Sequence, residues 1–138
     1  MTDRGESDLD SLLLDTRAFV WWVIGSDRLP SSVIDRIERA ARVCVSDVSL
    51  WEIVLKESTK HPMVGTDDAH RWFDEARSAT GFETLSITTR HIGGVQRLPL
   101  HHRDPFDRLL IAQAVAESLS VVSADTEFPA YPVETLWN

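Results

Sequence analysis

Short apolar runs alternate along the chain with longer segments of helical periodicity. The first run is Leu12, Leu13 and Leu14, which ends at Asp15. Consecutive apolar residues without alternating polar positions are typical of a strand that is buried on both faces, as in parallel sheets. Similar runs lie at residues 43–45 and 119–122, and weaker ones at 82–87 and 133–136. The pattern therefore predicts a sheet of short, buried strands.

Helical segments separate these strands. We expect helices over residues 16–24, from 31 to about 42, from 47 onward, over 69–80, from 88 or 89 with an interruption at Gly93-Gly94, and over 105–118. Capping patterns mark their starts: Pro30-Ser31-Ser32, Ser46 or Asp47, Thr66-Asp67-Asp68 and Asp104-Pro105. Gly25 and Gly81 mark two of the ends. On the helix after Ser46, the apolar residues Val48, Trp51, Val54 and Leu55 recur at helical spacing.

Alternation of strands and helices at this spacing predicts an α/β fold. The expected architecture has three layers, with a central, mostly parallel sheet flanked by helices. We expect a single domain over residues 11–138, preceded by a flexible acidic segment over residues 1–10. The length of 138 residues is ordinary for one domain with one hydrophobic core.

Composition narrows the protein class. The longest apolar stretch, residues 18–24, is far shorter than the roughly 20 residues that a bilayer span requires, and the first residues are acidic rather than basic. We therefore expect a cytoplasmic protein without a membrane partner. The lone cysteine, Cys44, lies within an apolar run, which indicates a buried thiol and excludes an internal disulfide or a cysteine-built zinc site.

Net charge bears on the partners. Lys and Arg number 14 against 22 Asp and Glu, which gives a net charge of −8. A protein that attracts nucleic acid through its overall field is expected to be basic. Either the chain does not bind nucleic acid, or its acidic residues collect divalent cations that meet phosphates locally.

Acidic residues follow the ends of the predicted strands. Asp15 follows the first strand, Glu52 lies on the helix after the second, and Asp125 follows the run at 119–122, while Asp104 and Asp107 share the first turn of a helix. Ligands of open parallel sheets bind at this edge. Converging carboxylates repel one another, and oxygen ligands select Mg²⁺ or Mn²⁺ rather than Zn²⁺. Each acid also has a local alternative as a helix cap or turn residue.

Basic and aromatic residues near these acids have two interpretations each. Arg17 and Arg108 could balance the acidic cluster or bind an RNA phosphate, and ion pairs with the acids explain them equally well. The stretch His101-His102-Arg103 could contact phosphate or a protein partner, although a solvated loop is the simpler interpretation. Three tryptophans are expected in the core or in a dimer interface: Trp21, Trp22 and Trp72.

Four sequence motifs together resemble the PIN domain, and more closely the VapC-type ribonuclease toxins of toxin–antitoxin pairs. They are Leu13-Leu14-Asp15-Thr16, the stretch 46–53 around Glu52, the stretch 102–114 with its Asp104-Pro105-Phe106-Asp107-Arg108 string, and Val122-Ser123-Ala124-Asp125. The resemblance spans about residues 12–137. It places the acidic quartet of the family on Asp15, Glu52, Asp107 and Asp125, with Ser123 as a polar neighbour. Asp104 matches an acid of one subgroup, and its role stays open.

The resemblance implies Mg²⁺-dependent endonucleolytic cleavage of RNA, blocked by a cognate antitoxin. We expect Asp15 and Asp107 to hold the principal Mg²⁺, with Mn²⁺ as a substitute, and Glu52 and Asp125 to complete the site. We also expect a homodimer. The antitoxin should reach the acids through Arg or Lys near its C-terminus and pack its apolar part near Trp51.

Two other functions remain open on the sequence. One is a non-catalytic PIN-like adaptor that binds RNA or protein. The other is a phosphatase of the haloacid-dehalogenase type, which also places an aspartate after its first strand. That chemistry requires a second acid two residues later, where this chain has Arg17.

Overall fold

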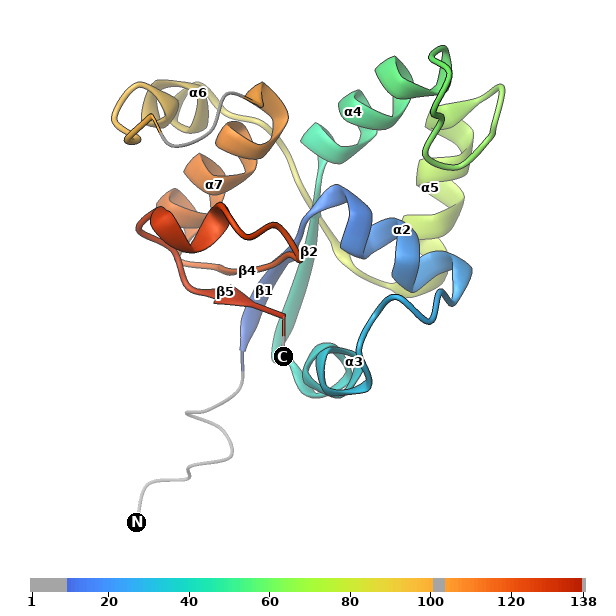
Figure 1. The fold of residues 1–138 in the computed structure, drawn as a ribbon, viewed down its shortest axis with the longest axis horizontal. Helices are drawn as coiled ribbons and strands as arrows, with labels where there is room; N and C mark the ends of the chain where they lie inside the picture. Colours follow the sequence, from blue (N-terminus) through green and yellow to red (C-terminus); the bar gives the residue numbers. More distant parts are fainter. Residues whose placement is uncertain (1–9, 101–103, 138) are drawn as a thin grey trace.

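The fold is a parallel sheet covered by helices (Figure 1). The computed structural model describes residues 10–100 and 104–137. Its strands are β1 (Ser11–Leu14), β2 (Arg42–Ser46), β3 (Glu83–Leu85), β4 (Ser120–Val122) and β5 (Thr135–Leu136), and their order in the sheet is β3-β2-β1-β4-β5. Every pairing is parallel. The three-layer α/β prediction is thus confirmed.

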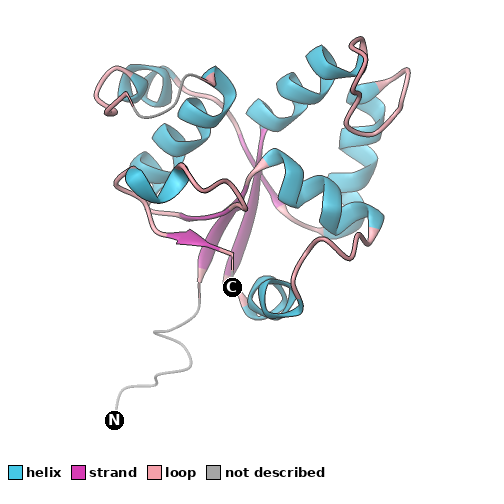
Figure 2. Ribbon diagram, in the orientation of Figure 1, coloured by secondary structure: helices cyan, strands magenta, loops and turns pink. Residues whose placement is uncertain are grey.

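Six α-helices and one 3-10 helix are found among the described residues (Figure 2). They are α2 (Thr16–Ile24), α3 (Ser31–Arg39), α4 (Asp47–Glu57), α5 (Ala69–Thr80), α6 (Thr89–Val95), α7 (Pro105–Glu117) and η1 (Phe128–Ala130). The helices α6 and α7 lie on one side of the sheet, and α2, α3 and α5 lie on the other (Figure 1).

Alternate residues of β1 pack into two separate hydrophobic cores. Leu12 and Leu14 pack in the core that contains Phe19 of α2, whereas Leu13 packs in the core that contains Leu110 of α7. All three leucines are fully buried, and each such side chain contributes about 1.5–3 kcal/mol to folding. The unbroken apolar run therefore reflects a strand with both faces covered. Cys44 is also buried, as the sequence predicts.

Side-chain caps start most of the helices, as predicted. Asp15, Ser46, Asp68 and Asp104 each accept a hydrogen bond from a backbone N–H in the first turn of the helix that follows. Each cap satisfies a donor that the helix itself leaves unpaired. Asp15 and Ser46 lie at the ends of β1 and β2, and Asp104 adjoins the expected site. These three caps therefore place three helix N-termini near that site.

The helix α3 begins at Ser31, as predicted, but its expected cap and its expected end are wrong. Pro30 occupies the cap position without a side-chain hydrogen bond, and the helix ends at Arg39 rather than near residue 42. The backbone N–H groups of Ala41 and Arg42 donate to the carbonyl oxygen of Asp10, at 2.8 and 3.3 Å. These hydrogen bonds to the residue before β1 end the helix and place the following residues in β2. No local sequence signal predicts this contact.

Three further predictions need correction. Gly93 and Gly94 do not interrupt α6, which is held by the capping box of Thr88 and the burial of His91. The strands β3 and β5 are shorter than the apolar runs that predicted them. On α4, Trp51, Val54 and Leu55 are exposed, because the helix buries the face that carries Val48, Ser49, Glu52 and Ile53.

Asp10, the last residue of the segment expected to be flexible, makes side-chain contacts with α3. Asp10 accepts two hydrogen bonds from the guanidinium of Arg36, both at 3.2 Å. Residues 1–9 lie outside the described residues, so the rest of that prediction is not tested. No helix within residues 10–100 and 104–137 is long and apolar enough to cross a membrane.

Candidate active site

A cavity of about 400 Å³ lies at the carboxyl ends of the strands. Asp15 reaches it from the end of β1, Glu52 from α4, and Asp125 from the loop after β4. The complete lining is Asp15, Thr16, Arg17, Glu52, Lys56, Asp104, Asp107, Ala124, Asp125 and Glu127. The structure therefore brings together the four expected acids and Asp104 from segments that are far apart in the sequence.

Asp15 is both a helix cap and a buried acid of the cavity. Its Oδ1 accepts a hydrogen bond of 2.8 Å from the backbone N–H of Ala18, and its carboxylate also accepts one from the hydroxyl of Ser123. The pKa of Asp15 is raised from 3.8 to about 6, chiefly because the carboxyl group is buried. The two hydrogen bonds oppose this rise, and the negative charges of Glu52 and Asp125 add to it. The pKa of Asp15 thus depends in part on the other carboxylates of the cavity.

Ser123 links two of the acids. Its buried hydroxyl donates to Asp15, while its Oγ accepts a hydrogen bond of 3.0 Å from the backbone N–H of Asp125. Asp125 in turn accepts from the backbone N–H of Glu127 at 2.8 Å, which closes the turn after β4. The predicted polar neighbour and the predicted turn residue therefore belong to one hydrogen-bonded unit.

Glu52 is buried on α4 and pairs with a lysine of the same helix. Nζ of Lys56 lies 2.6 Å from Oε2 of Glu52. Lys56 is not among the site residues predicted from the sequence, although a Glu and a Lys four residues apart on a helix are an expected pair. Ser49, one turn before Glu52, accepts a hydrogen bond of 3.0 Å from the hydroxyl of Thr16, which fixes α4 against the start of α2.

Asp104 and Asp107 both line the cavity from the start of α7. Oδ1 of Asp104 accepts hydrogen bonds from the backbone N–H groups of Phe106, at 2.9 Å, and Asp107, at 3.2 Å. Asp104 is therefore the cap that the Asp-Pro pair predicts, and the cap itself borders the cavity. Its position keeps a role at the site open.

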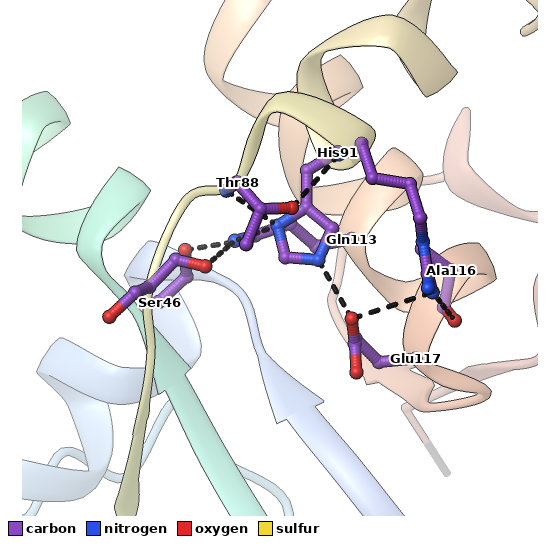
Figure 3. Close-up of polar contacts among 8 residues, drawn as sticks. Ser46, Thr88, His91, Gln113, Ala116 and Glu117 are labelled. Carbon is purple, nitrogen blue, oxygen red and sulfur yellow. Dashed lines mark hydrogen bonds and ion pairs between the residues drawn. The ribbon is translucent and has the colours of Figure 1, made fainter.

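A buried hydrogen-bond network fixes the start of α4 to α6 and α7 (Figure 3). The hydroxyl of Ser46 donates to Oε1 of Gln113 at 2.5 Å, and Nε2 of Gln113 lies 3.3 Å from Nδ1 of His91. Because Nδ1 accepts from the backbone N–H of Thr88, the ring proton sits on Nε2 and is donated to Glu117 at 2.9 Å. This hydrogen bond lowers the pKa of Glu117. The network was not foreseen from the sequence.

The two arginines near the acids have different positions. Arg17 lines the cavity, whereas Arg108 does not. The guanidinium of Arg108 donates to the carbonyl oxygens of Pro99, at 2.8 Å, and Val95, at 3.1 Å, and so holds the chain after α6. The expectation that Arg108 balances the acidic cluster is therefore not supported. His101, His102 and Arg103 lie outside the described residues.

The chemistry of the lining suits a hard divalent cation. Six carboxylates surround the cavity, from Asp15, Glu52, Asp104, Asp107, Asp125 and Glu127, against the two cationic side chains of Arg17 and Lys56 among the described residues. Carboxylate oxygens are the ligands that Mg²⁺ and Mn²⁺ prefer. Within residues 10–100 and 104–137, no three His, Cys, Asp or Glu side chains are yet grouped tightly enough to hold a metal ion. Binding would therefore require carboxylates to turn toward the ion.

Comparisons with known proteins agree with this architecture. The model of the PIN domain matches residues 12–134. A chain of the VapBC2 structure from Rickettsia felis, bound to a promoter DNA fragment, has a TM-score of 0.67 at 18% identity and covers 92% of this chain and 98% of its own length. A chain of DNA-bound VapBC from Salmonella typhimurium has a TM-score of 0.67 at 18% identity, covering 94% and 100%.

A third structural relative is VapBC-5 from Mycobacterium tuberculosis, a member of a toxin–antitoxin family. It has a TM-score of 0.60 at 22% identity and covers 93% of this chain and 98% of its own. No curated protein sequence matches significantly. At these identities, the structural likeness establishes the fold.

Proposed function

This chain belongs to the PIN domain family, and on that premise we propose that it is a Mg²⁺-dependent endoribonuclease that also accepts Mn²⁺. We further propose that it acts in the cytoplasm as the toxin of a type II toxin–antitoxin pair. The structural relatives from Rickettsia felis and Salmonella typhimurium are VapBC proteins, which supports this assignment.

One observation carries the nuclease proposal. Asp15, Glu52, Asp107 and Asp125 come from four separate segments and line one cavity at the carboxyl ends of parallel strands. Caps and turns account for single acids, as they do for Asp15 and Asp125. They do not account for the convergence of all four on one cavity, where carboxylates outnumber the cationic side chains of Arg17 and Lys56 and a bound cation would relieve the remaining repulsion.

The acids divide into two pairs in this proposal. Asp15 and Asp107 hold the principal ion, and Glu52 and Asp125 complete its surroundings and orient the attacking water. A bound divalent cation would polarise a phosphoryl oxygen and lower the pKa of water at the site. Ser123 keeps Asp15 and Asp125 in position through its two hydrogen bonds. Arg17 provides positive charge at the cavity for an RNA phosphate.

An apolar groove beside the acidic cavity fits a protein inhibitor. It has a volume of about 820 Å³, and its lining is Trp51, Ile87, Ile92, Val95, Gln96, Leu100, Pro105, Arg108 and Leu109. Trp51 and Leu100 are 45% and 70% exposed, which leaves apolar surface for a partner. The proposed antitoxin packs its apolar part in this groove and places an Arg or Lys among the carboxylates, where it competes with the cation.

A non-catalytic adaptor is the second candidate. It is favoured by the apolar groove, whose exposed Trp51 and Leu100 offer a partner surface that needs no catalysis. A haloacid-dehalogenase-type phosphatase is not retained, because the chain belongs to the PIN domain family and Arg17 stands where that chemistry requires an acid.

An RNA cleavage assay separates the nuclease from the adaptor. We expect the purified protein to cut RNA internally in the presence of Mg²⁺ or Mn²⁺, and we expect EDTA to stop this cleavage. The variants Asp107→Asn and Glu52→Gln should lose cleavage and keep the fold. Asp67→Asn, an exposed acid outside the cavity, is the matched control. Cleavage that survives EDTA, or folded protein that binds RNA without cutting it under any metal condition, would contradict the proposal.

A further inference from the structure

Lys56 lines the acidic cavity and its ammonium group already contacts one of the proposed metal ligands. We propose that Lys56 is the counter-cation of the metal-free site, that a divalent cation displaces its ammonium from Glu52, and that the displaced ammonium binds a phosphate of the RNA. This inference rests on the proposed function and adds to it a substrate-binding residue that metal loading releases.

The geometry of the pair shows which partner can move. Nζ of Lys56 lies 2.6 Å from Oε2 of Glu52, one helical turn away. The Glu52 side chain is 7% exposed, whereas that of Lys56 is 34% exposed. The carboxylate is thus largely shielded from solvent, and the ammonium reaches it from the solvent side on a flexible four-carbon stem. Lys56 can swing away from Glu52 without disturbing the core.

Charge explains why a metal ion would displace Lys56. The ammonium and the ion both seek the carboxylate of Glu52, and two cations this close repel each other strongly where burial reduces screening by water. The doubly charged ion can also recruit Asp15, a buried carboxylate that lines the same cavity. The lysine interacts with one buried acid, whereas the ion interacts with several.

The same residue is placed to receive the substrate. Arg17 and Lys56 are the cationic side chains that line the cavity among the described residues. The nearby guanidinium of Arg108 is occupied by two backbone carbonyls and lies outside the lining. A phosphodiester that enters an acidic cavity requires positive charge at its non-bridging oxygens, and a released ammonium supplies it.

Metal affinity is the first test. Titration calorimetry with Mn²⁺ alone, at fixed pH and salt, compares the wild type with Lys56→Met, Lys56→Arg and Lys60→Met. Lys60 is exposed and lies outside the cavity lining, so its replacement controls for the change in net charge. We expect Lys56→Met to bind Mn²⁺ roughly threefold tighter or more, because the competing cation is gone, and Lys60→Met to match the wild type.

RNA affinity is the second test. Fluorescence anisotropy follows a short single-stranded RNA in Ca²⁺, which replaces Mg²⁺ so that binding is measured without turnover. We expect Lys56→Met to weaken binding and to reduce the slope of log K against log salt by about 0.7, the value for one lost phosphate contact on a single strand. Lys56→Arg should retain the contact. Thermal melts of each variant confirm folding, and Lys56→Gln replaces Lys56→Met if the latter melts early.

The outcomes separate this inference from the proposed function. A wild type that binds Mn²⁺, together with a Lys56→Met variant whose Mn²⁺ affinity is equal or weaker, overturns the displacement of Lys56 and leaves the nuclease proposal intact. If Lys56→Met binds Mn²⁺ more tightly but the slope of its log K for RNA against log salt is unchanged, the proposed contact between Lys56 and a phosphate is overturned. A wild type that binds no divalent cation overturns the proposed function as well.

Discussion

The rings of Trp51 and Phe106 meet edge to face, with 4.7 Å between their centroids and 73° between their planes. Each aromatic residue directly precedes an acid of the cavity, Glu52 on α4 and Asp107 on α7. The two helices thus touch beside their carboxylates. Ser46, the N-cap of α4, and Gln113 of α7 also join these two elements through a buried hydrogen bond. An apolar contact and a polar contact together set the separation of the two acids.

Removal of the aromatic contact should affect the site more than the fold. Trp51→Ala loses an aromatic pair worth about 0.5–1.5 kcal/mol. We expect a modest loss in the free energy of unfolding, measured by urea denaturation, together with clearly weaker Mn²⁺ binding by calorimetry. Val54→Ala, on the same helix and exposed to a similar extent, is the control and should change only stability. Equal Mn²⁺ affinity in the two variants would show that the ring contact does not position Glu52.

Asp15→Asn should stabilise the metal-free protein at neutral pH. Because the pKa of Asp15 is raised from 3.8 to about 6, the folded state binds more protons than the unfolded state in this interval. Stability contributed by protonated Asp15 is therefore present below pH 3.8 and lost as pH rises through about 6. A pKa shift of this size corresponds to a loss of about 3 kcal/mol in the free energy of unfolding. Asn cannot ionise, so it avoids this loss while it still accepts the hydrogen bond from the N–H of Ala18.

The measurement is urea denaturation in EDTA between about pH 4 and 8. Asp15→Asn should gain stability relative to the wild type as pH rises through this range. Asp68→Asn makes the same cap substitution on α5, at an exposed position outside the cavity, and should show no such trend. A pH-independent difference between Asp15→Asn and the wild type would contradict the electrostatic account of Asp15.

Divalent cations should raise the melting temperature of the wild type. A ligand that binds the folded state alone stabilises it by about 2.7 kcal/mol at a concentration one hundred times its Kd. In Asp107→Asn, most of this increment should disappear, while the metal-free protein melts slightly higher because one repelling charge is gone. Scanning calorimetry with Mg²⁺, Mn²⁺ and EDTA provides the comparison, with Asp67→Asn as the charge control. Identical melting curves with and without metal would contradict the shared site.

Gln113→Leu should be the most destabilising of these changes. It leaves the hydroxyl of Ser46 without its buried acceptor and removes the amide beside His91. An unsatisfied buried polar group costs about 1–3 kcal/mol. Gln96→Leu, at an exposed position, should be close to neutral in the same urea denaturation. A loss for Gln113→Leu no larger than for Gln96→Leu would show that the network does not hold α4, α6 and α7 together.

Local features of the fold were readable from the sequence because their causes lie within a few residues. The unbroken leucines before Asp15 predict a strand buried on both faces, and the structure buries all three. Asp104-Pro105 predicts a capped helix start, which follows from one carboxylate and one fixed backbone angle. The motifs around Asp15, Glu52, Asp107 and Asp125 also sufficed to identify the candidate acids, because the strand and helix starts that position them are local signals.

Only the tertiary structure decided features that depend on distant residues. The end of α3 at Arg39 follows from the carbonyl of Asp10, and the exposure of Trp51 follows from which face of α4 meets the core. Arg108 donates to the carbonyl oxygens of Pro99 and Val95, which lie 9 and 13 residues before it in the sequence. Lys56 became part of the site only once Glu52 was seen to be buried beside the other acids. The sequence by itself determined which residues could act, whereas long-range packing determined which of them meet, because burial and charge proximity arise only when separate strands and helices assemble.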